Sequence, residues 1–390
     1  MKKFSIIILH YNQMDYIEEA FKYTFNQTYS NYEVIFADDA TPNFDKKEVI
    51  NKINKYNKNN IPYKIIDNKE NSGTVKNLNK AIKKATGDYI LFYAADDRLY
   101  DEKVLEKFVK GFEDEKKKII TSQCIFYDEK LKKKQLSFVP SLKALLLNKR
   151  SSKKMFEKMA KKCLYASGAT AYKKEIFEKY GYFDEKYIYV EDWSYWLKVL
   201  NNGEKIYYMN FNSLCHRDGG ISHSSYDKNT IPKHVKQYYK DIINIYKNEI
   251  FPNFDKISYI YKLRILLQFQ ETVNSFSLFV PELKEDLKYV NNFKSKKFNS
   301  LIWKVATLIS IFERNIGRRF RLSIKFDKIF RYTLILWFIL SIVLSLIIRN
   351  SNIMLTIYVL SYFVIYAFIN FIANIVRYYK NYDEGGIDYV

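Results

Sequence analysis

Short apolar runs alternate with amphipathic stretches through the first hundred residues of the chain. Apolar side chains recur at three- and four-residue spacing from 16 to 24 and again after residue 73, which predicts helices. Between these stretches, apolar runs bounded by turn-forming residues predict buried strands, at 6–9, 33–37, 63–66 and 89–93. The alternation predicts an α/β fold with a mostly parallel sheet flanked by helices.

The pattern changes in the second half of the chain. Long helical stretches run from about Lys228 to Phe330, and two charge-free segments follow. These segments of 17 and 24 residues suit helices that cross a bilayer, with a buried hairpin in a soluble core as the alternative. The segments span 332–348 and 353–376. We therefore expect four parts: an α/β domain at 1–227, a helical and basic region at 228–330, a transmembrane hairpin at 331–377 and a tail at 378–390.

Much of the net charge of +21 lies just before the first charge-free segment. Residues 294–331 hold eleven basic and two acidic side chains, which gives +9 in 38 residues. The positive-inside rule then places the α/β domain and both ends of the hairpin on the cytosolic side of the cell membrane. Apolar residues interleave with these basic ones, which predicts an interfacial helix on an anionic membrane surface; a solvated basic face is the alternative.

Several protein classes lack their sequence signals here. Three cysteines without CxxC spacing exclude a disulfide framework and a zinc-finger pattern, and they indicate a reducing compartment. The motifs of P-loop nucleotidases, dinucleotide dehydrogenases, Ser-His-Asp hydrolases and HExxH metalloproteases are missing from the sequence. The positive charge would fit nucleic-acid binding, but no recognition motif supports it, so we expect no nucleic-acid partner.

Two acidic pairs follow predicted strands. Asp38-Asp39 comes after the second strand and Asp96-Asp97 after the fourth. Ligands of open α/β sheets bind outside the carboxyl ends of the strands, so both pairs should lie at one crevice. Four carboxylates there would repel one another, which favours a site for Mg²⁺ or Mn²⁺ with phosphate oxygens. For a single pair, a turn or a helix cap is the alternative.

A third acidic pair, Glu191-Asp192, opens a predicted helix. The apolar residues that follow have helical spacing, so the pair lies in the first helical turn. Stabilisation of the helix dipole is the alternative to a chemical role.

The order of several short motifs resembles that of the family-2 glycosyltransferases, inverting nucleotide-sugar enzymes of GT-A fold. The resemblance runs from Lys3 to about Ser224, a little over half of the chain. In the opening strand, Leu9 or His10 replaces the family's usual Pro. The motifs that carry the resemblance are Phe4 to Asn12, Asn26 to Tyr29, Tyr32 to Asp39, Asn71-Ser-Gly73, Lys76-Asn77, Gly87 to Ile90, Ser167-Gly168-Ala169, Phe183-Asp184-Glu185 and Glu191-Asp192-Trp193.

This resemblance implies roles for the donor side. Asp39 would accept a hydrogen bond from the nucleobase, with uracil the first choice, and Asp38 would assist. Tyr11 would lie against the base. Lys76 stands where the family often has Arg near the diphosphate, and it keeps the charge but loses the bidentate fork. The remaining donor-side residues are Asp96 and Asp97, which would hold the ribose and the metal, with Asp97 as the direct ligand.

One departure from the family concerns the metal. Many members have an Asp where this chain has Ala94, so metal use is an open question. His216 resembles the His of the family's closing stretch and would ligate the metal or touch the diphosphate; an ordinary loop histidine is the alternative. For His10 and His223 no catalytic role is expected.

On the acceptor side, the resemblance makes Asp192 the general base, beside Glu191. A carboxylate within hydrogen-bond reach would take the proton of the acceptor hydroxyl as it attacks the anomeric carbon.

We therefore expect a membrane-attached inverting glycosyltransferase that uses a nucleotide-diphospho-sugar, first a UDP-sugar. Its acceptor would be a hydroxyl of a lipid-linked glycan in the synthesis of a bacterial surface polysaccharide. A polyprenyl-phosphate sugar transferase is one alternative. A non-catalytic membrane scaffold with a degenerate nucleotide-sugar domain is another.

Overall fold

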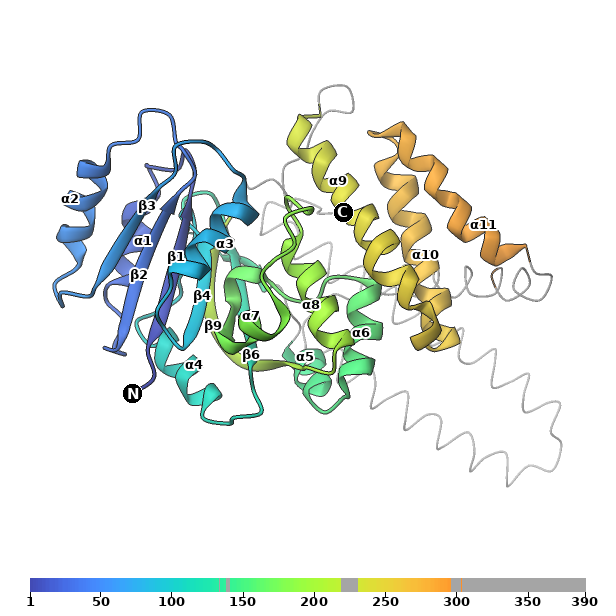
Figure 1. Cartoon of the computed structure of the whole chain (residues 1–390), viewed down its shortest axis with the longest axis horizontal. Helices are drawn as coiled ribbons and strands as arrows, with labels where there is room; N and C mark the ends of the chain where they lie inside the picture. The colour runs from blue at the N-terminus through green and yellow to red at the C-terminus, as the bar shows by residue number, and fades with distance from the viewer. Residues whose placement is uncertain (133, 138–140, 219–230, 296–302, 304–390) are drawn as a thin grey trace, which may run out of the picture. The chain divides into compact units, whose positions relative to one another are not determined.

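The computed structural model describes residues 1–132, 134–137, 141–218, 231–295 and 303 (Figure 1). Met1–Phe293 form one compact unit. The described helices contain no stretch with both the length and the apolar character that a membrane crossing needs. The two predicted spans and most of the predicted basic helix lie outside the described residues.

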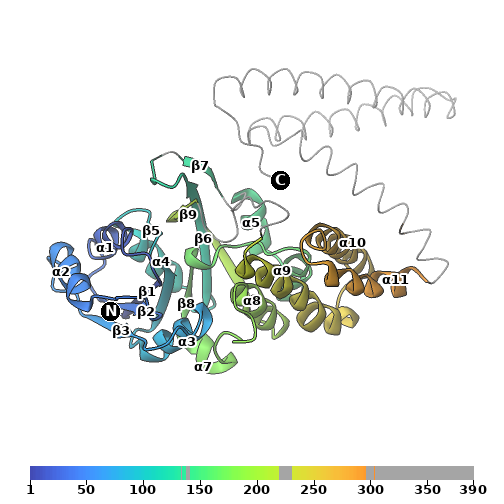
Figure 2. The ribbon, with the colours of Figure 1, turned by 90° about the horizontal axis from the view of Figure 1, so that it is seen from above.

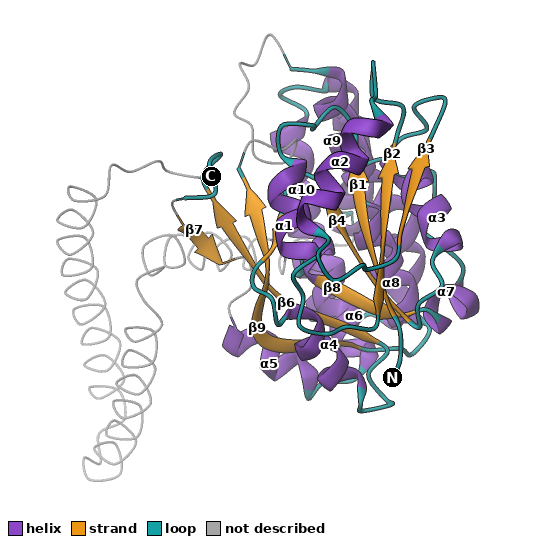
Figure 3. Ribbon diagram, turned by 90° about the vertical axis from the view of Figure 1, so that its left-hand side faces the viewer, coloured by secondary structure: helices purple, strands orange, loops and turns teal. Residues whose placement is uncertain are grey.

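A single mixed sheet forms the centre of this unit. Its strands are hydrogen-bonded in the order β3-β2-β1-β4-β8-β6-β9-β5, and β7 pairs with β6. Strands β1 to β4 are the four predicted from the apolar runs, and they are parallel, as Figure 3 shows for β1, β2 and β3. The strands span Phe4–His10, Tyr32–Asp38, Tyr63–Asp67, Tyr89–Ala94, Arg98–Leu99, Ile119–Tyr127, Lys134–Ser137, Thr170–Lys173 and Ile206–Arg217 for β1 to β9.

The expectation of a mostly parallel sheet is wrong for its second half. Strand β8 is antiparallel to both β4 and β6, and β5 is antiparallel to β9. Strands β6 and β9 are parallel again, with register shifts between Thr121 and Cys124. The chain reaches β8 through two helices, at Ser141–Asn148 and Ser152–Lys161, and β8 then enters the middle of the sheet between β4 and β6.

Helices cover both faces of the parallel half. Figure 2 shows α1 and α4 on one face and α3 on the other. The predicted helices at 16–24 and after residue 73 are confirmed as α1 and α3, and the helix opened by Glu191 is confirmed as α8. The helices span Ile17–Thr24, Lys46–Tyr56, Thr74–Lys84, Val104–Phe112, Ser141–Asn148, Ser152–Lys161, Glu175–Tyr180, Glu191–Asn201, Lys233–Ile245, Tyr259–Phe276 and Lys288–Lys294 for α1 to α11.

The compact unit extends beyond the α/β domain that the sequence predicts at 1–227. Helix α10 packs against α6, the π-helical turn η2 (Tyr246–Ile250) packs against α8, and α9 packs against η2 and α10. Trp193 of α8 joins these layers, since its indole N–H donates to the Met159 carbonyl at 2.9 Å and its ring lies 5.5 Å from that of Tyr246. Residues from 233 to 293 therefore belong to the same body as the sheet.

Candidate active site

The carboxyl ends of β2, β1 and β4 lie next to one another. In the register of the sheet, His10 pairs with Asp38 and Leu9 pairs with Ala94. Tyr11 and the two acidic pairs therefore leave the sheet at the same edge, with one pair on each side of β1. Two inter-strand spacings separate the pairs, which is roughly 10 Å.

Asp38 is fully buried and engaged within the protein. Its Oδ1 accepts hydrogen bonds from His10 Nδ1 and Thr41 Oγ1, both at 2.6 Å, and its Oδ2 accepts from the Thr41 N–H at 2.9 Å. Burial raises the pKa of Asp38, but these hydrogen bonds outweigh it and leave the pKa below its usual value. Both oxygens are therefore committed to holding the turn after β2, which fits positioning better than ligand contact.

Asp39 connects that turn to the loop before α3. Its Oδ1 accepts from the Ser72 N–H at 2.9 Å and the Ser72 hydroxyl at 2.8 Å, and its Oδ2 accepts from the Gly73 N–H at 2.7 Å. Gly73 has φ of +85°, a backbone conformation that favours glycine. Asp39 thus fixes the N-terminal end of α3 at the carboxyl edge of the sheet.

Two other predicted donor-side residues face solvent at this edge. Tyr11 follows β1 and is 48% exposed, which leaves its ring available for stacking. Lys76 is exposed in the first turn of α3, and within the described part of the chain its ammonium makes no hydrogen bond or ion pair.

The second acidic pair meets the end of β9. Asp97 is 5% exposed; its carboxylate lies 3.0 Å from His216 Nδ1 and accepts the Arg217 N–H at 3.0 Å. Burial lowers the pKa of His216, but the charges of Asp97 and Asp96 outweigh it and raise that pKa above its usual value. Burial, followed by the charge of Asp97, raises the pKa of Asp96 to about 6. Of the predicted metal ligands, Asp97 and His216 are therefore in contact, and Asp96 is close enough for its charge to act on His216.

Arg217 is a residue of this cluster that the sequence did not single out. Its Nε donates to the Asp96 carbonyl at 2.9 Å, and its guanidinium lies 4.3 Å from the centre of the Tyr16 ring. A second guanidinium nitrogen donates to the Glu129 carbonyl. Arg217 thus places a fixed positive charge beside the acidic pair. In the sequence, its position next to the predicted ligand His216 could have drawn attention to it.

Glu191 and Asp192 form the first turn of α8. Glu191 is 8% exposed, and Asp192 is partly buried with its Oδ1 accepting the Trp193 N–H at 2.6 Å. Burial raises the pKa of both carboxyls, and for Glu191 the charges of Asp192 and Asp241 add to that rise. The pair is thus a proton acceptor whose basicity is increased by its surroundings.

The loop at 163–169 contacts both α8 and the end of β4. The ring of Tyr165 packs at 6.1 Å on Trp196 of α8, while a side chain added at Gly168 would lie 3.2 Å from Tyr93 of β4. Within the described residues, the buried hydroxyls of Tyr165 and Ser167 have no hydrogen-bond partner. A buried hydroxyl without a partner is rare, so these two groups are candidates for ligand contact.

Comparison with known proteins gives this arrangement a family context. Residues 5–181 match the family model described as glycosyl transferase family 2. This match covers a little under half of the chain and indicates a glycosyltransferase domain in its N-terminal part. The predicted GT-A type of fold agrees with this assignment, with the mixed sheet described above.

Relatives of the glycosyltransferase domain have a range of names. The uncharacterized glycosyltransferase MJ1057 of Methanocaldococcus jannaschii is 28% identical over 203 residues, which cover 52% of this chain and 66% of the relative. The minor teichoic acid biosynthesis protein GgaB of Bacillus subtilis is 37% identical over 131 residues, which cover 32% of this chain and 14% of the relative. The chain thus spans only part of each relative.

Solved structures resemble the chain more weakly. The structure of S. aureus TarS 1-349 in complex with UDP-GlcNAc has a TM-score of 0.45 and 16% identity, and the match covers 70% of this chain and 81% of that one.

The donor set at Asp96 and Asp97 fits a hard divalent cation. Adjacent carboxylates supply the oxygen ligands that Mg²⁺ and Mn²⁺ prefer, and the pair keeps a raised pKa at Asp96 that a cation would relieve. Among the described residues, no three His, Cys, Asp or Glu side chains are grouped as a complete metal site. A cation here would therefore take its other ligands from a diphosphate and water.

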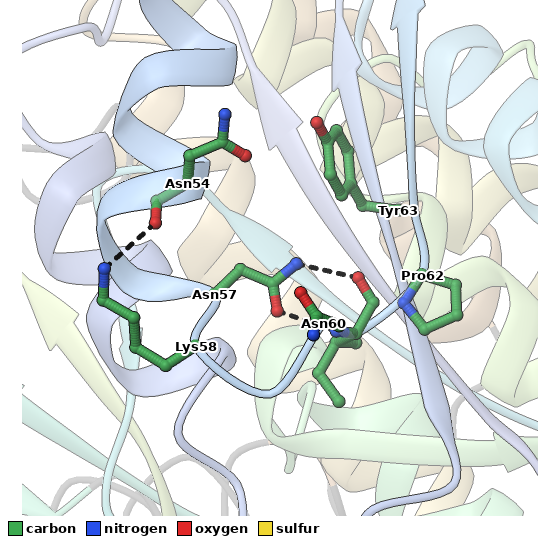
Figure 4. A pocket seen from close by; sticks show the side chains of 7 residues that line it. Asn54, Asn57, Lys58, Asn60, Pro62 and Tyr63 are labelled. Atoms are coloured by element: carbon green, nitrogen blue, oxygen red, sulfur yellow. Dashed lines mark hydrogen bonds between the residues drawn. The ribbon is translucent and has the colours of Figure 1, made fainter.

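A hollow of about 560 Å³ lies away from these groups, between α2 and β3 (Figure 4). Its polar side chains bond locally: Asn57 accepts the Ile61 N–H at 2.8 Å and donates to the Ile61 carbonyl at 2.9 Å. The hollow contains no acidic side chain and lies at the amino end of β3, so we assign it no part in the chemistry.

Proposed function

We propose that the protein transfers a sugar, with inversion, from a nucleotide-diphospho-sugar to a hydroxyl of a lipid-linked glycan. The donor is first of all a UDP-sugar. The setting is the cytosolic face of the cell membrane during synthesis of a bacterial surface polysaccharide. The name of the relative GgaB, a teichoic acid biosynthesis protein, supports that setting.

One observation carries the proposal. Carboxylates lie on both sides of β1 at one edge of the sheet, and helix α8 begins with two carboxyls of raised pKa, of which Glu191 is buried and Asp192 is partly buried. The proposal assigns Asp39 and Tyr11 to the nucleobase, and Asp97 to the cation and diphosphate. The loop at 163–169 joins that end of the sheet to α8.

The chemistry follows from these groups. Asp192 takes the proton of the acceptor hydroxyl, whose oxygen then forms the new bond to the anomeric carbon. The bond from that carbon to the diphosphate oxygen breaks, and its electron pair leaves with the nucleoside diphosphate. Attack opposite to the leaving group inverts the anomeric configuration.

Two positive groups could stabilise the negative charge on the leaving diphosphate: the Lys76 ammonium and a divalent cation. The exposed ammonium of Lys76 reaches out from α3 beside the Asp39 loop, and it can pair with a phosphate without first breaking an ion pair within the described residues. A bound Mg²⁺ or Mn²⁺ would supply positive charge for the departing diphosphate, held by Asp97 and Asp96 with His216 next to them.

The membrane part of the proposal rests on sequence. Two charge-free segments and the basic residues at 294–331 favour a chain held at an anionic membrane surface. Confinement to that surface raises the effective concentration of an acceptor carried on a lipid.

The test is a donor screen on the full chain in detergent. Release of nucleoside diphosphate from UDP-glucose, UDP-N-acetylglucosamine and GDP-mannose is followed with Mn²⁺, Mg²⁺ or EDTA. We expect activity with a UDP-sugar, loss of activity in Asp97→Ala, and a loss of about 10²-fold or more in Asp192→Asn, which is the usual contribution of a general base. Donor binding should persist in Asp192→Asn.

The control is Asp45→Asn, which removes a carboxylate at the N-cap of α2, outside the site. Full activity of Asp192→Asn would contradict the assignment of the general base. Turnover on a polyprenyl phosphate that is unaffected by Asp192→Asn would instead favour the polyprenyl-phosphate sugar transferase, because a phosphate acceptor needs no base.

A further inference from the structure

The segment that leads into α8 is held by a helix from beyond the matched family domain. Asp241 of α9 is 1% exposed, and its Oδ2 accepts the N–H groups of Ile188 at 2.7 Å and Tyr189 at 3.1 Å. Its Oδ1 accepts from Gln237 Nε2 at 2.7 Å. Both amides lie within three residues of Glu191, so one buried carboxylate orients the chain just before the candidate base.

A second carboxylate supports the same segment. Glu249 of η2 accepts from the Tyr187 hydroxyl at 2.8 Å and from the Lys186 ammonium at 2.9 Å. The turn η2 is π-helical, and such turns occur mostly as single features that re-aim side chains, often near functional sites. Residues 186–189 are therefore attached to α9 and η2 at several points.

We propose that Asp241 is a positioning residue that sets the orientation of the Glu191-Asp192 pair through the backbone of residues 188 and 189. This rests on the proposed function, in which Asp192 is the general base. It also explains why the helices from 233 onward belong to the same compact unit as the sheet. A base that must meet the acceptor hydroxyl within hydrogen-bond distance loses efficiency when its backbone moves by about 1 Å.

The negative charge of Asp241 also affects the carboxylate pair electrostatically. It faces Glu191 and adds to the rise of that pKa, after burial and the charge of Asp192. The pair is coupled, so its titration belongs to both carboxyls together. Removing the negative charge of Asp241 therefore moves the apparent pKa of the pair down. Among the described residues, the other titratable groups that interact with the pair include Cys163, Tyr172 and Tyr238.

Two substitutions separate geometry from charge. Asp241→Ala removes every acceptor. Asp241→Asn keeps one acceptor oxygen for the two backbone N–H groups and can donate to Gln237 after that amide turns over, but it removes the charge. The control is Asp286→Ala, since Asp286 is also a buried carboxylate of the helical region and pairs with Lys247 at 2.9 Å without contact to the loop.

The first readout is independent of activity. Amide hydrogen exchange of the full chain in detergent is compared over residues 184–190. We expect faster exchange there in Asp241→Ala, near wild-type exchange in Asp241→Asn and no local change in Asp286→Ala. Equal protection of residues 184–190 in Asp241→Ala and the wild type would overturn the proposal.

The second readout is the pH profile of nucleoside diphosphate release from UDP-N-acetylglucosamine or UDP-glucose, whichever is turned over. We expect kcat to fall roughly 10- to 100-fold in Asp241→Ala with little change in the donor KM. Asp241→Asn should recover most of kcat while its acidic limb moves to lower pH. If Asp241→Ala does not fold, the test rests on Asp241→Asn alone. An unchanged acidic limb of the pH profile in Asp241→Asn would then count against the proposal. Should Asp192→Asn keep full activity, the base assignment fails instead, whatever the exchange data show.

Discussion

Glu191 shows at the scale of one residue how a catalytic arrangement lowers stability. Burial, the charge of Asp192 and then that of Asp241 raise the pKa of Glu191 in the folded chain. The folded chain therefore holds this proton more tightly than the unfolded chain, in which Glu titrates near about 4.3. The resulting stabilisation is fully present below that value and is lost as the pH rises through the raised folded pKa. At alkaline pH, ionised Glu191 therefore lowers the stability of the folded chain.

Glu191→Gln should therefore stabilise the protein more at pH 8 than at pH 5. Each unit of pKa shift corresponds to about 1.4 kcal/mol, so a gain of at least that size is expected at pH 8. Thermal unfolding at both pH values measures it, with Glu185→Gln as the matched control, because that carboxyl is exposed to solvent. A gain that is equal at both pH values would contradict the raised pKa.

The same residue-level detail limits what the sequence could predict. The two carboxylates of Asp38-Asp39 are adjacent in sequence, yet one bonds to His10 and Thr41 and the other to Ser72 and Gly73. The expected repulsion among four carboxylates is reduced by these hydrogen-bond partners and by the positive charge of Arg217. Most of these partners, such as His10 and Ser72, lie about 30 residues away along the chain, so the local sequence around Asp38 and Asp39 could not reveal them.

At the scale of elements, the turn between α3 and β4 depends on one glycine. The Gly87 N–H donates to Ser5 Oγ at 2.9 Å, and a Cβ there would lie 2.7 Å from the Ser5 backbone N and 2.8 Å from the Phe4 carbonyl carbon. Both close atoms are backbone atoms of the central strand β1, so they cannot move without shifting the sheet.

We expect Gly87→Ala to destabilise the protein by about 1–3 kcal/mol or more, the usual cost of overpacking. The matched comparison is Gly111→Ala in α4, where the added Cβ meets the side chains of Met209 and Ile120 instead of backbone. Both contacts involve the far ends of side chains, and alanine gains about 1 kcal/mol of helix propensity over glycine, so that change should cost less than Gly87→Ala. Thermal melts of both variants measure the difference, and equal effects would argue against a rigid contact at Gly87.

Elements with a clean apolar pattern were predictable, and those with buried polar residues were not. Strands β1, β2 and β4 each contain an unbroken apolar run of four or five residues, at 6–9, 34–37 and 89–93, which their sequences show. Strand β6 instead buries Thr121 and Ser122, whose hydroxyls bond to Thr170 of β8 and Ser213 of β9. These cross-strand bonds satisfy the polar groups, but they break the pattern that identifies a strand from sequence.

At the scale of the whole molecule, the helices after residue 233 contact the segment that leads to the proposed base. They were predicted as a separate basic region, but α9 and η2 contact the segment before α8 directly. The compact unit therefore ends at Phe293, and the strongly basic stretch begins at Lys294. A base held by α9 lies in the same body that precedes the proposed membrane attachment.

The proposed topology makes one prediction about the whole chain. Cys124 and Cys215 are buried, so a Cys163→Ser background leaves little reactive thiol for a labelling experiment. Ser351→Cys, in the turn between the two charge-free segments, should then react with a membrane-impermeant maleimide in intact cells. Glu113→Cys, on the exposed end of α4, should react only after permeabilisation. The basic residues at 294–331 dictate this sidedness, because positive charge is retained on the cytosolic face. Labelling of both positions only after permeabilisation would exclude two full crossings, and the chain would then attach through its basic stretch alone.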